Sequence, residues 1–184
     1  MQDIELGFHR KARVWIYDKP QILYPAIETV SLDIERSLSR NSQKEKTGAL
    51  EILIPVGGRF FYGLLGAEFI PNDSGNFTVE VLISTDQERI YKQSIASKLD
   101  QIRVGLPSEY SQSVINGITE PLNKETLRKL GSGLLRFNQG AYSNVGSSNK
   151  IFRHIATTVV QLLMVQRGSN DQEVTKIVKD YSSV

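Results

Sequence analysis

The stretch ALEILIPVGGRFFYGLLGAEFIPNDSGNFTVEVLIS, residues 49–84, decides the fold class. It holds three runs of apolar, β-branched and aromatic residues, a composition typical of strands. A glycine pair separates the first run from the second, and the turn sequence PNDSG separates the second from the third. The stretch therefore predicts three successive strands over 49–56, 59–70 and 76–84, paired as an antiparallel meander. We expect the second strand to be weakened or bulged at Gly63 and Gly66.

The residues before this stretch predict one strand and one helix. ARVWIY, residues 12–17, is typical of a strand, and Pro20 ends it because proline cannot donate to a β-ladder. In PAIETVSLDIERSLSR, apolar residues recur three and four positions apart and would line one helical face. We therefore predict a helix over about 22–39. Its apolar positions are Ile27, Val30, Ile34 and Leu38.

The residues after the stretch alternate between helices and one more strand. We expect a helix from Asp86 to Leu99, a helix capped by Ser108 and ending near Leu122, and a fifth strand, GLLRFN, over 133–138. The last long helix runs from Ser147 or Ser148 to about Gln166, followed by a short terminal helix in VTKIVKDY.

This order of elements predicts an α+β fold. We expect a mostly antiparallel sheet with helices layered on one face, built as a single domain over residues 1–184. The chain has 184 residues, enough for one ordinary core. There are no cysteines, which excludes disulfides and thiolate metal sites. We expect no cofactor and no metal. We expect no membrane partner either, because no long apolar window occurs and the N-terminus does not resemble a signal peptide. The sequence thus favours a cytoplasmic protein.

Charge is distributed unevenly along the chain. The formal net charge is +2, but the segment from Pro121 to Gly168 carries seven basic residues and one acidic residue, Glu125. Such a local excess can steer a polyanion toward the protein. A solvated basic face with no ligand is the alternative interpretation. The seven are Lys124, Arg128, Lys129, Arg136, Lys150, Arg153 and Arg167.

The candidate site is the uncharged loop GAYSNVGSSN, residues 140–149, which leads into the last helix. A helix N-terminus exposes unpaired N–H groups and a partial positive charge, so an anion could bind there. We expect Ser147 or Ser148 to cap the helix and Tyr142 to stack on a base. Capping alone would also explain the serines. The candidate RNA- or anion-binding residues are Arg136, Gly140, Tyr142, Ser143, Asn144, Ser147, Ser148, Lys150 and Arg153.

Three stretches in this order resemble the fourth domain of bacterial elongation factor G. GGRFFYGLLGAEFIPNDSGNFTVEV, from Gly57, resembles its glycine-rich hairpin, and GLPSEYSQSVINGI, from Gly105, is similar to its first helix start. The loop at 140–149 resembles the loop that opens its second helix. The matching loop positions are Gly140, Tyr142, Val145, Ser147 and Ser148.

The resemblance covers about residues 49–166, and it marks 18–48 and 85–104 as additions. It implies the fold of the second domain of ribosomal protein S5, with a left-handed βαβ crossover. In the translocase the tip of this domain contacts transfer RNA and messenger RNA at the ribosomal decoding site. This chain departs from the family loop, which has a histidine at the position of Ser143 and acidic residues at those of Gly146 and Asn149.

Other constellations point away from catalysis. His9 and His154 are the only histidines, and His154 lies beside the apolar stripe of the last helix. Small-molecule kinases share the broad fold, but the glycine-rich phosphate loop that they need is missing. The resemblance and the basic segment favour a non-enzymatic module that contacts structured RNA or the ribosome. The alternative is a protein-interaction module or homodimer, with the predicted helix at 22–39 as its seam.

Overall fold

The computed structural model describes residues 1–34, 44–84, 89–120, 124–169 and 171–181. Within them the chain forms eight strands and four helices. The strands are β1 (Gln2–Gly7), β2 (Arg10–Ile16), β3 (Glu28–Ile34), β4 (Lys46–Val56), β5 (Arg59–Pro71), β6 (Phe77–Ile83), β7 (Arg103–Val104) and β8 (Gly133–Tyr142). The helices are α1 (Ser108–Ile118), α2 (Lys124–Leu130), α3 (Asn149–Leu162) and α4 (Asp171–Tyr181).

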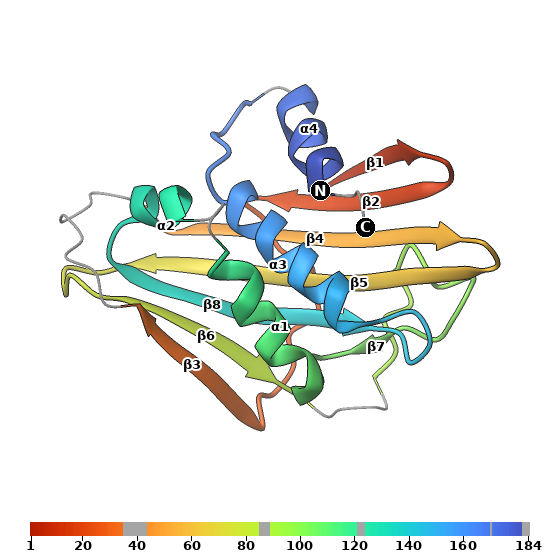
Figure 1. The fold of residues 1–184 in the computed structure, drawn as a ribbon, viewed down its shortest axis with the longest axis horizontal. Coiled ribbons are helices and arrows are strands. Elements are labelled where there is room, and N and C mark those ends of the chain that lie inside the picture. Colours follow the sequence, from red (N-terminus) through yellow and green to blue (C-terminus); the bar gives the residue numbers. More distant parts are fainter. Residues whose placement is uncertain (35–43, 85–88, 121–123, 170, 182–184) are drawn as a thin grey trace.

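All eight strands belong to one mixed sheet. Its strand order is β1-β2-β4-β5-β8-β6-β3, and the short β7 pairs with the end of β8. Every pairing is antiparallel except that of β6 with β8. β1 and β3 are therefore the two edges of the sheet, as Figure 1 shows.

Helices α1 and α3 lie side by side over one face of this sheet (Figure 1). Both are amphipathic, and the buried stripe of α3 includes Ile151, Phe152, Ile155 and Val159. The ring of Phe152 stacks on Tyr110 of α1, with centroids 4.6 Å apart. This two-layer arrangement confirms the predicted α+β class, with a mostly antiparallel sheet and helices on one face.

The predicted meander is wrong in its strand order. β4 and β5 do form an antiparallel hairpin through Gly57–Gly58, but β6 does not pair with β5. β8 lies between them, antiparallel to β5 and parallel to β6. The turn before β6 fixes only that the chain reverses; it does not fix which strands become neighbours. The β5–β8 pairing shifts register between Gly66 and Ala67, but the extra residue is Asn138 of β8, so the predicted bulge in β5 is wrong; Gly63 pairs regularly with Ile52.

The predicted helix over 22–39 is also wrong where the structure describes it. Glu28–Ile34 is the edge strand β3, and 35–43 lie outside the described residues. Val30, Leu32 and Ile34 alternate along this strand and pack against the core. An alternating pattern of apolar residues is thus embedded in a spacing that also suits a helix.

Residues 89–99, the described part of the predicted helix at 86–99, form consecutive turns instead. Two backbone amides of this segment have partners outside it. The Tyr91 amide donates to the carbonyl of Ile102, and the Ile95 amide donates to the carboxylate of Glu51. Because these donors are used elsewhere, a helical ladder does not form.

The remaining predictions hold with shifted boundaries. α1 begins at Ser108, but its N-cap is Pro107 without a side-chain cap, and the helix ends at Ile118 rather than near Leu122. β8 extends four residues beyond the predicted end at Asn138, to Tyr142. α3 ends at Leu162, and the terminal helix is present as α4. The N-terminal strand β1 was not predicted.

Candidate functional site

Half of the predicted loop, residues 140–149, is buried. Gly140 and Tyr142 belong to β8, and the Tyr142 side chain is only 6% exposed. Ser143 is fully buried, whereas Asn144 is exposed and Val145 is 79% exposed. The expectation of an exposed apex is therefore wrong for residues 140–143 and for Gly146, whereas Asn144, Val145 and Asn149 are exposed. With its ring buried, Tyr142 presents no free face for stacking in this structure.

The Ser143 side chain organises the loop from inside. Its hydroxyl donates to Oδ2 of Asp100 at 2.5 Å. Its oxygen accepts from the backbone amides of Val145, at 3.1 Å, and Gly146, at 2.7 Å. These bonds turn the loop amides inward, so the two amides cannot serve an external anion.

The two serines before α3 also have internal partners. Ser148 is the N-cap, as expected, and its hydroxyl oxygen accepts from the Ile151 amide at 3.4 Å. The Ser147 hydroxyl donates to the carbonyl of Tyr62 at 2.8 Å and accepts from the Ser143 amide. Both serines thus hold the loop against β5 and cap α3, and this accounts for their positions without a ligand.

The loop glycines are required by close contacts. A Cβ at Gly140 would lie 2.9 Å from the carbonyl oxygen of Gly105, and a Cβ at Gly146 would lie 2.4 Å from the Phe60 ring. Neither glycine has a positive φ, so our expectation that they provide unusual backbone conformations is wrong. Their role is to let β8 and the loop approach neighbouring chain segments.

The predicted cations do not gather into one basic face. Arg136 lies in mid-strand and pairs with Glu80 at 2.8 Å and with Glu68 at 3.8 Å. Arg153 pairs with Glu120 at 2.6 Å. These acidic partners come from outside the basic segment of the sequence, so folding balances much of its charge. Lys150 is exposed at the start of α3 and has no ion pair within the part of the chain that the structure describes.

Three turns lie at the same end of the sheet, where α3 begins (Figure 1). They are the β1–β2 turn over 7–10, the β4–β5 turn over 56–59 and the exposed loop residues Asn144 and Val145. The pairing of Lys11 with Leu53 places the first turn beside the second, and the Tyr62 amide donates to the Gly146 carbonyl beside the third. We call this surface the loop end.

The loop end combines cations with exposed apolar side chains. Phe8 is 90% exposed, Val145 is 79% exposed and Val56 is 47% exposed. Arg59 is exposed and, like Lys150, has no ion pair among the described residues. Sequence reasoning missed the contribution of the two hairpin turns. The signal that could have found it was the aromatic and basic run FHRK, residues 8–11, between two strand-like segments.

Two acidic side chains lie close to the loop end. Glu5 pairs with Lys11 at 3.6 Å, and Asp100 is engaged by the Ser143 hydroxyl. The charge of Lys11 therefore offsets that of Glu5, and one oxygen of the Asp100 carboxylate accepts the Ser143 hydrogen bond.

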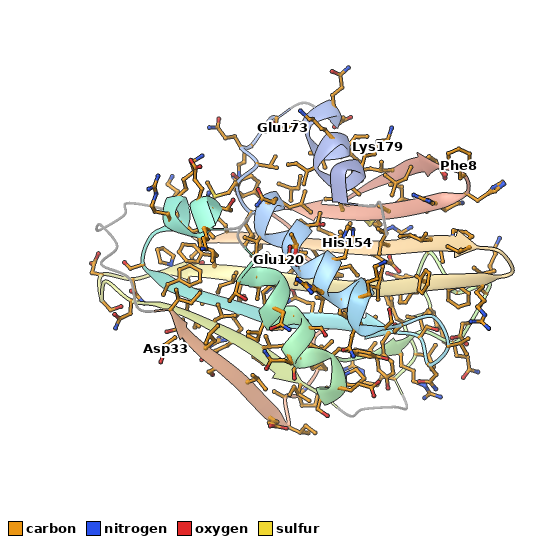
Figure 2. The ribbon with its side chains drawn as sticks, in the orientation of Figure 1. Phe8, Asp33, Glu120, His154, Glu173 and Lys179 are labelled. Atoms are coloured by element: carbon orange, nitrogen blue, oxygen red, sulfur yellow. The ribbon has the colours of Figure 1, made fainter. Side chains whose placement is uncertain are left out.

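His154 lies on α3, away from the loop end (Figure 2). Burial lowers its pKa to about 4, and the nearby charge of Lys150 contributes to the same shift. The imidazole is therefore neutral at neutral pH. This agrees with the sequence interpretation of His154 as a partly buried helix residue.

A buried polar group lies on the sheet face opposite the helices. Glu51 is fully buried; the Tyr62 hydroxyl donates to it at 2.8 Å, and the Ile95 amide donates to it at 3.1 Å. Arg13 lies 3.7 Å from its other carboxylate oxygen and donates to the carbonyl of Gln93. Burial raises the pKa of Glu51. These contacts fasten the segment 89–102 to the sheet, which makes the group structural.

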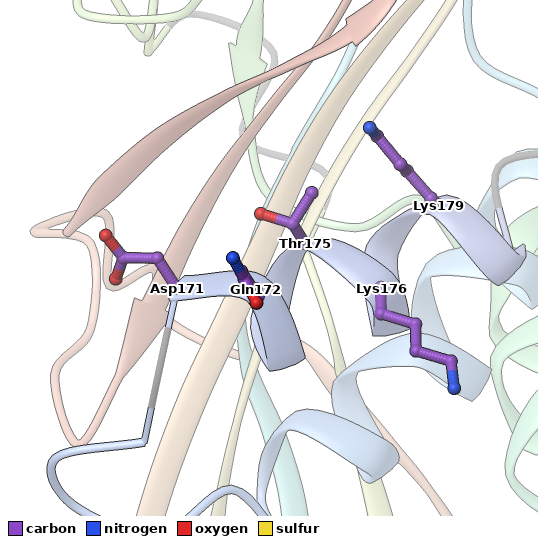
Figure 3. A pocket seen from close by; sticks show the side chains of 5 residues that line it. All are labelled: Asp171, Gln172, Thr175, Lys176 and Lys179. Atoms are coloured by element: carbon purple, nitrogen blue, oxygen red, sulfur yellow. The ribbon is translucent and has the colours of Figure 1, made fainter.

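Hollows lie beside α4. One, of about 390 Å³, runs along one side of the helix, and Figure 3 shows its side chains projecting from successive turns. Its described lining is Asp171, Gln172, Thr175, Lys176 and Lys179. Another, of about 270 Å³, includes Tyr17, whose ring lies under the guanidinium of Arg167 at 4.9 Å.

Comparison with known proteins leaves the family open. No protein-family model matches the chain, and no curated protein sequence matches it. No group of three or more metal-ligating side chains occurs in the described residues. None of the described helices is long and apolar enough to cross a membrane.

Proposed function

We propose that this protein is a non-enzymatic cytoplasmic binding module that contacts structured RNA, or the ribosome, through its loop end. The proposal rests on one observation: the three turns lie at the same end of the sheet and carry the exposed cations Arg59 and Lys150 together with exposed apolar side chains. Cations bind phosphates, and apolar or aromatic side chains contact unpaired bases. The candidate residues Asn144 and Lys150 belong to this surface. Ser143, Ser147 and Ser148 hold this surface in place through their hydrogen bonds, whereas Arg136 and Arg153 are paired with glutamates.

The order of the elements supports the resemblance to the translocase domain. The three resembling stretches lie in β5–β6, at the start of α1 and at the end of β8 before α3, and β6 and β8 are parallel neighbours whose connection includes β7, α1 and α2. In Figure 1 both strands run to the right, the helices lie in front and β8 lies above β6. This arrangement favours a left-handed crossover, the unusual hand of the S5-like fold. The hairpin β1–β2 and the segment 89–102 would be additions to it.

Co-sedimentation with purified bacterial ribosomes, and with an RNA hairpin in solution, tests the proposal. We expect binding that weakens steeply with salt. The variant Arg59→Glu/Lys150→Glu should bind more weakly. Each phosphate that it no longer neutralises should reduce, by about 1, the slope of the logarithm of the binding constant against the logarithm of the salt concentration. The matched control is Arg128→Glu/Lys176→Glu, which makes the same change in net charge at exposed positions on α2 and α4. Equal binding by both variants, or no binding by the natural chain, would contradict the proposal.

A homodimer is the second candidate, and the edge strand β3 favours it. β3 pairs only with β6 among the described residues, so its outer edge offers backbone groups to another strand. Ile27, directly before it, is 64% exposed. The seam would then be a strand, where the sequence predicted a helix. Light scattering of the natural chain and of Val30→Pro distinguishes a monomer from a homodimer. A natural chain that is dimeric and a variant that is monomeric, neither of which binds RNA, would favour this candidate.

A further inference from the structure

The tip of the β1–β2 hairpin has an unusual backbone for its residues. Gly7 pairs with Arg10, so Phe8 and His9 form a two-residue turn. Phe8 has φ 53° and His9 has φ 61°, both in the left-handed region. These values are those of a type I′ turn, where asparagine and glycine are strongly preferred. A phenylalanine here is a backbone outlier, and such outliers gather at functional sites.

Phe8 contributes almost nothing to the core. Its side chain is 90% exposed, the largest exposed fraction among the large hydrophobic residues that the structure describes. Figure 2 shows it at the outer end of the hairpin, remote from the helices. A strained position that holds an aromatic ring in solvent stabilises nothing within the described chain. The ring is therefore available to a partner.

The surroundings of Phe8 favour an anionic partner. His9, Arg10 and Lys11 follow it directly, and Arg59 lies in the adjacent β4–β5 turn. The two turns over 7–10 and 56–59 contain no acidic residue; Glu5, in β1, pairs with Lys11. An aromatic ring with cations on one exposed edge is the combination that binds unpaired nucleotides: the ring stacks on a base and the cations contact phosphates.

We propose that Phe8 stacks on an unpaired base of the RNA that the loop end binds; this inference rests on the proposed function. The target RNA must then contain an unpaired base, because a base inside a duplex is already stacked on its neighbours and cannot stack on Phe8. RNA with a single-stranded loop or bulge is therefore preferred over fully paired RNA. The base would then contact Phe8 at the hairpin tip, and the phosphates would contact the cations of the neighbouring turn.

Fluorescence anisotropy with two labelled RNAs tests the inference: a hairpin with an unpaired loop, and a blunt duplex of equal length. We expect the natural chain to prefer the loop RNA. Phe8→Ala should weaken loop binding by roughly 5- to 150-fold, the range for removal of one base stack, and leave duplex binding unchanged. Phe8→Tyr should restore loop binding, since its ring also stacks. Ile27→Ala, which truncates an exposed apolar side chain away from this turn, is the matched control and should bind as the natural chain does.

The two proposals fail in different ways. If Phe8→Ala binds loop RNA normally while Arg59→Glu/Lys150→Glu does not, stacking is overturned and RNA binding stands. Equal weakening on loop and duplex would also overturn stacking on an unpaired base. If the natural chain binds neither RNA, both proposals fall. Binding to vesicles of phosphatidylserine and phosphatidylcholine should then be measured. If the natural chain binds these vesicles but not RNA, and Phe8→Ala does not bind them, the hairpin tip contacts a membrane surface instead.

Discussion

The Ser143 hydroxyl donates to Oδ2 of Asp100 across 2.5 Å and so joins the loop before α3 to the segment on the opposite face of the sheet. Ser143 is fully buried, and its oxygen also accepts two loop amides. One side chain therefore fixes the shape of the loop and its attachment to residues 89–102. The Ser143 side chain faces inward and fixes the loop, so the loop can contribute only exposed residues such as Asn144 and Val145 to a ligand surface.

Ser143→Ala should destabilise the protein. The substitution removes the acceptor of the buried Gly146 amide and of the Val145 amide, and the donor to Oδ2 of Asp100; each unsatisfied buried group costs about 1–3 kcal/mol. We expect a lower free energy of unfolding in urea by about 2–4 kcal/mol. Asn144→Ala, at the exposed neighbouring position, should change it by less than about 0.5 kcal/mol. A Ser143→Ala protein as stable as Asn144→Ala would contradict the role assigned to this hydroxyl.

Glu51 should make stability fall as pH rises. Burial raises its pKa above the ordinary value of 4.5, against the opposing effects of hydrogen bonds from Ser94, Tyr62 and the Ile95 amide and the charge of Arg13. The folded chain then holds this proton more tightly than the unfolded chain, so the stabilisation is present below pH 4.5 and is lost as pH rises through the raised pKa.

Urea unfolding of the natural protein and of Glu51→Gln, from about pH 4.5 to pH 8, measures this contribution. The variant carries a neutral side chain of similar shape at every pH. We expect the natural protein to lose stability relative to Glu51→Gln as pH increases. Parallel pH profiles for the two proteins would show that the Glu51 pKa is not raised by folding.

The local elements could be predicted from the sequence because their signals are local. Alternation in 77–83, the turn at Gly57–Gly58 and the Ser148 cap act over a few residues. The insertion of β8 between β5 and β6 could not be predicted in this way, since strand order is set by packing between distant segments. β3 was misread because Val30 and Ile34 satisfy both a helical and an alternating pattern.

The candidate site was only partly predictable. The sequence identified the loop before α3, but it could not reveal that Asp100 would come from a distant turn to engage Ser143. It counted Arg136 and Arg153 as cations without the glutamates that folding brings to them. The loop end itself combines turns from residues 7–10, 56–59 and 144–145, and their proximity follows from strand register alone.

His154 should titrate far below an ordinary histidine. Burial, and secondarily the charge of Lys150, lower its pKa from 6.5 to about 4. The unfolded chain binds this proton more readily, so stability from this group is complete above pH 6.5 and is lost as pH falls toward 4. NMR titration of the imidazole C–H signals measures the midpoint, with His9→Ala assigning the two histidines. Lys150→Gln should raise the midpoint; a His154 midpoint near 6.5 in the natural protein would contradict its burial.

The turn variant Phe8→Asn/His9→Gly should be more stable than the natural protein. A residue held outside its favoured backbone region costs of order 1–3 kcal/mol, and asparagine followed by glycine adopts the type I′ turn with little strain. We expect the free energy of unfolding in urea to rise by about 1–2 kcal/mol, partly offset because glycine adds freedom to the unfolded chain. Asn144→Gly, in a loop residue without a positive φ, is the control and should bring no gain. A less stable turn variant would mean that the Phe8 ring supports the fold; a more stable one, with RNA binding abolished, would mean that strain is retained there for the sake of contact with a partner.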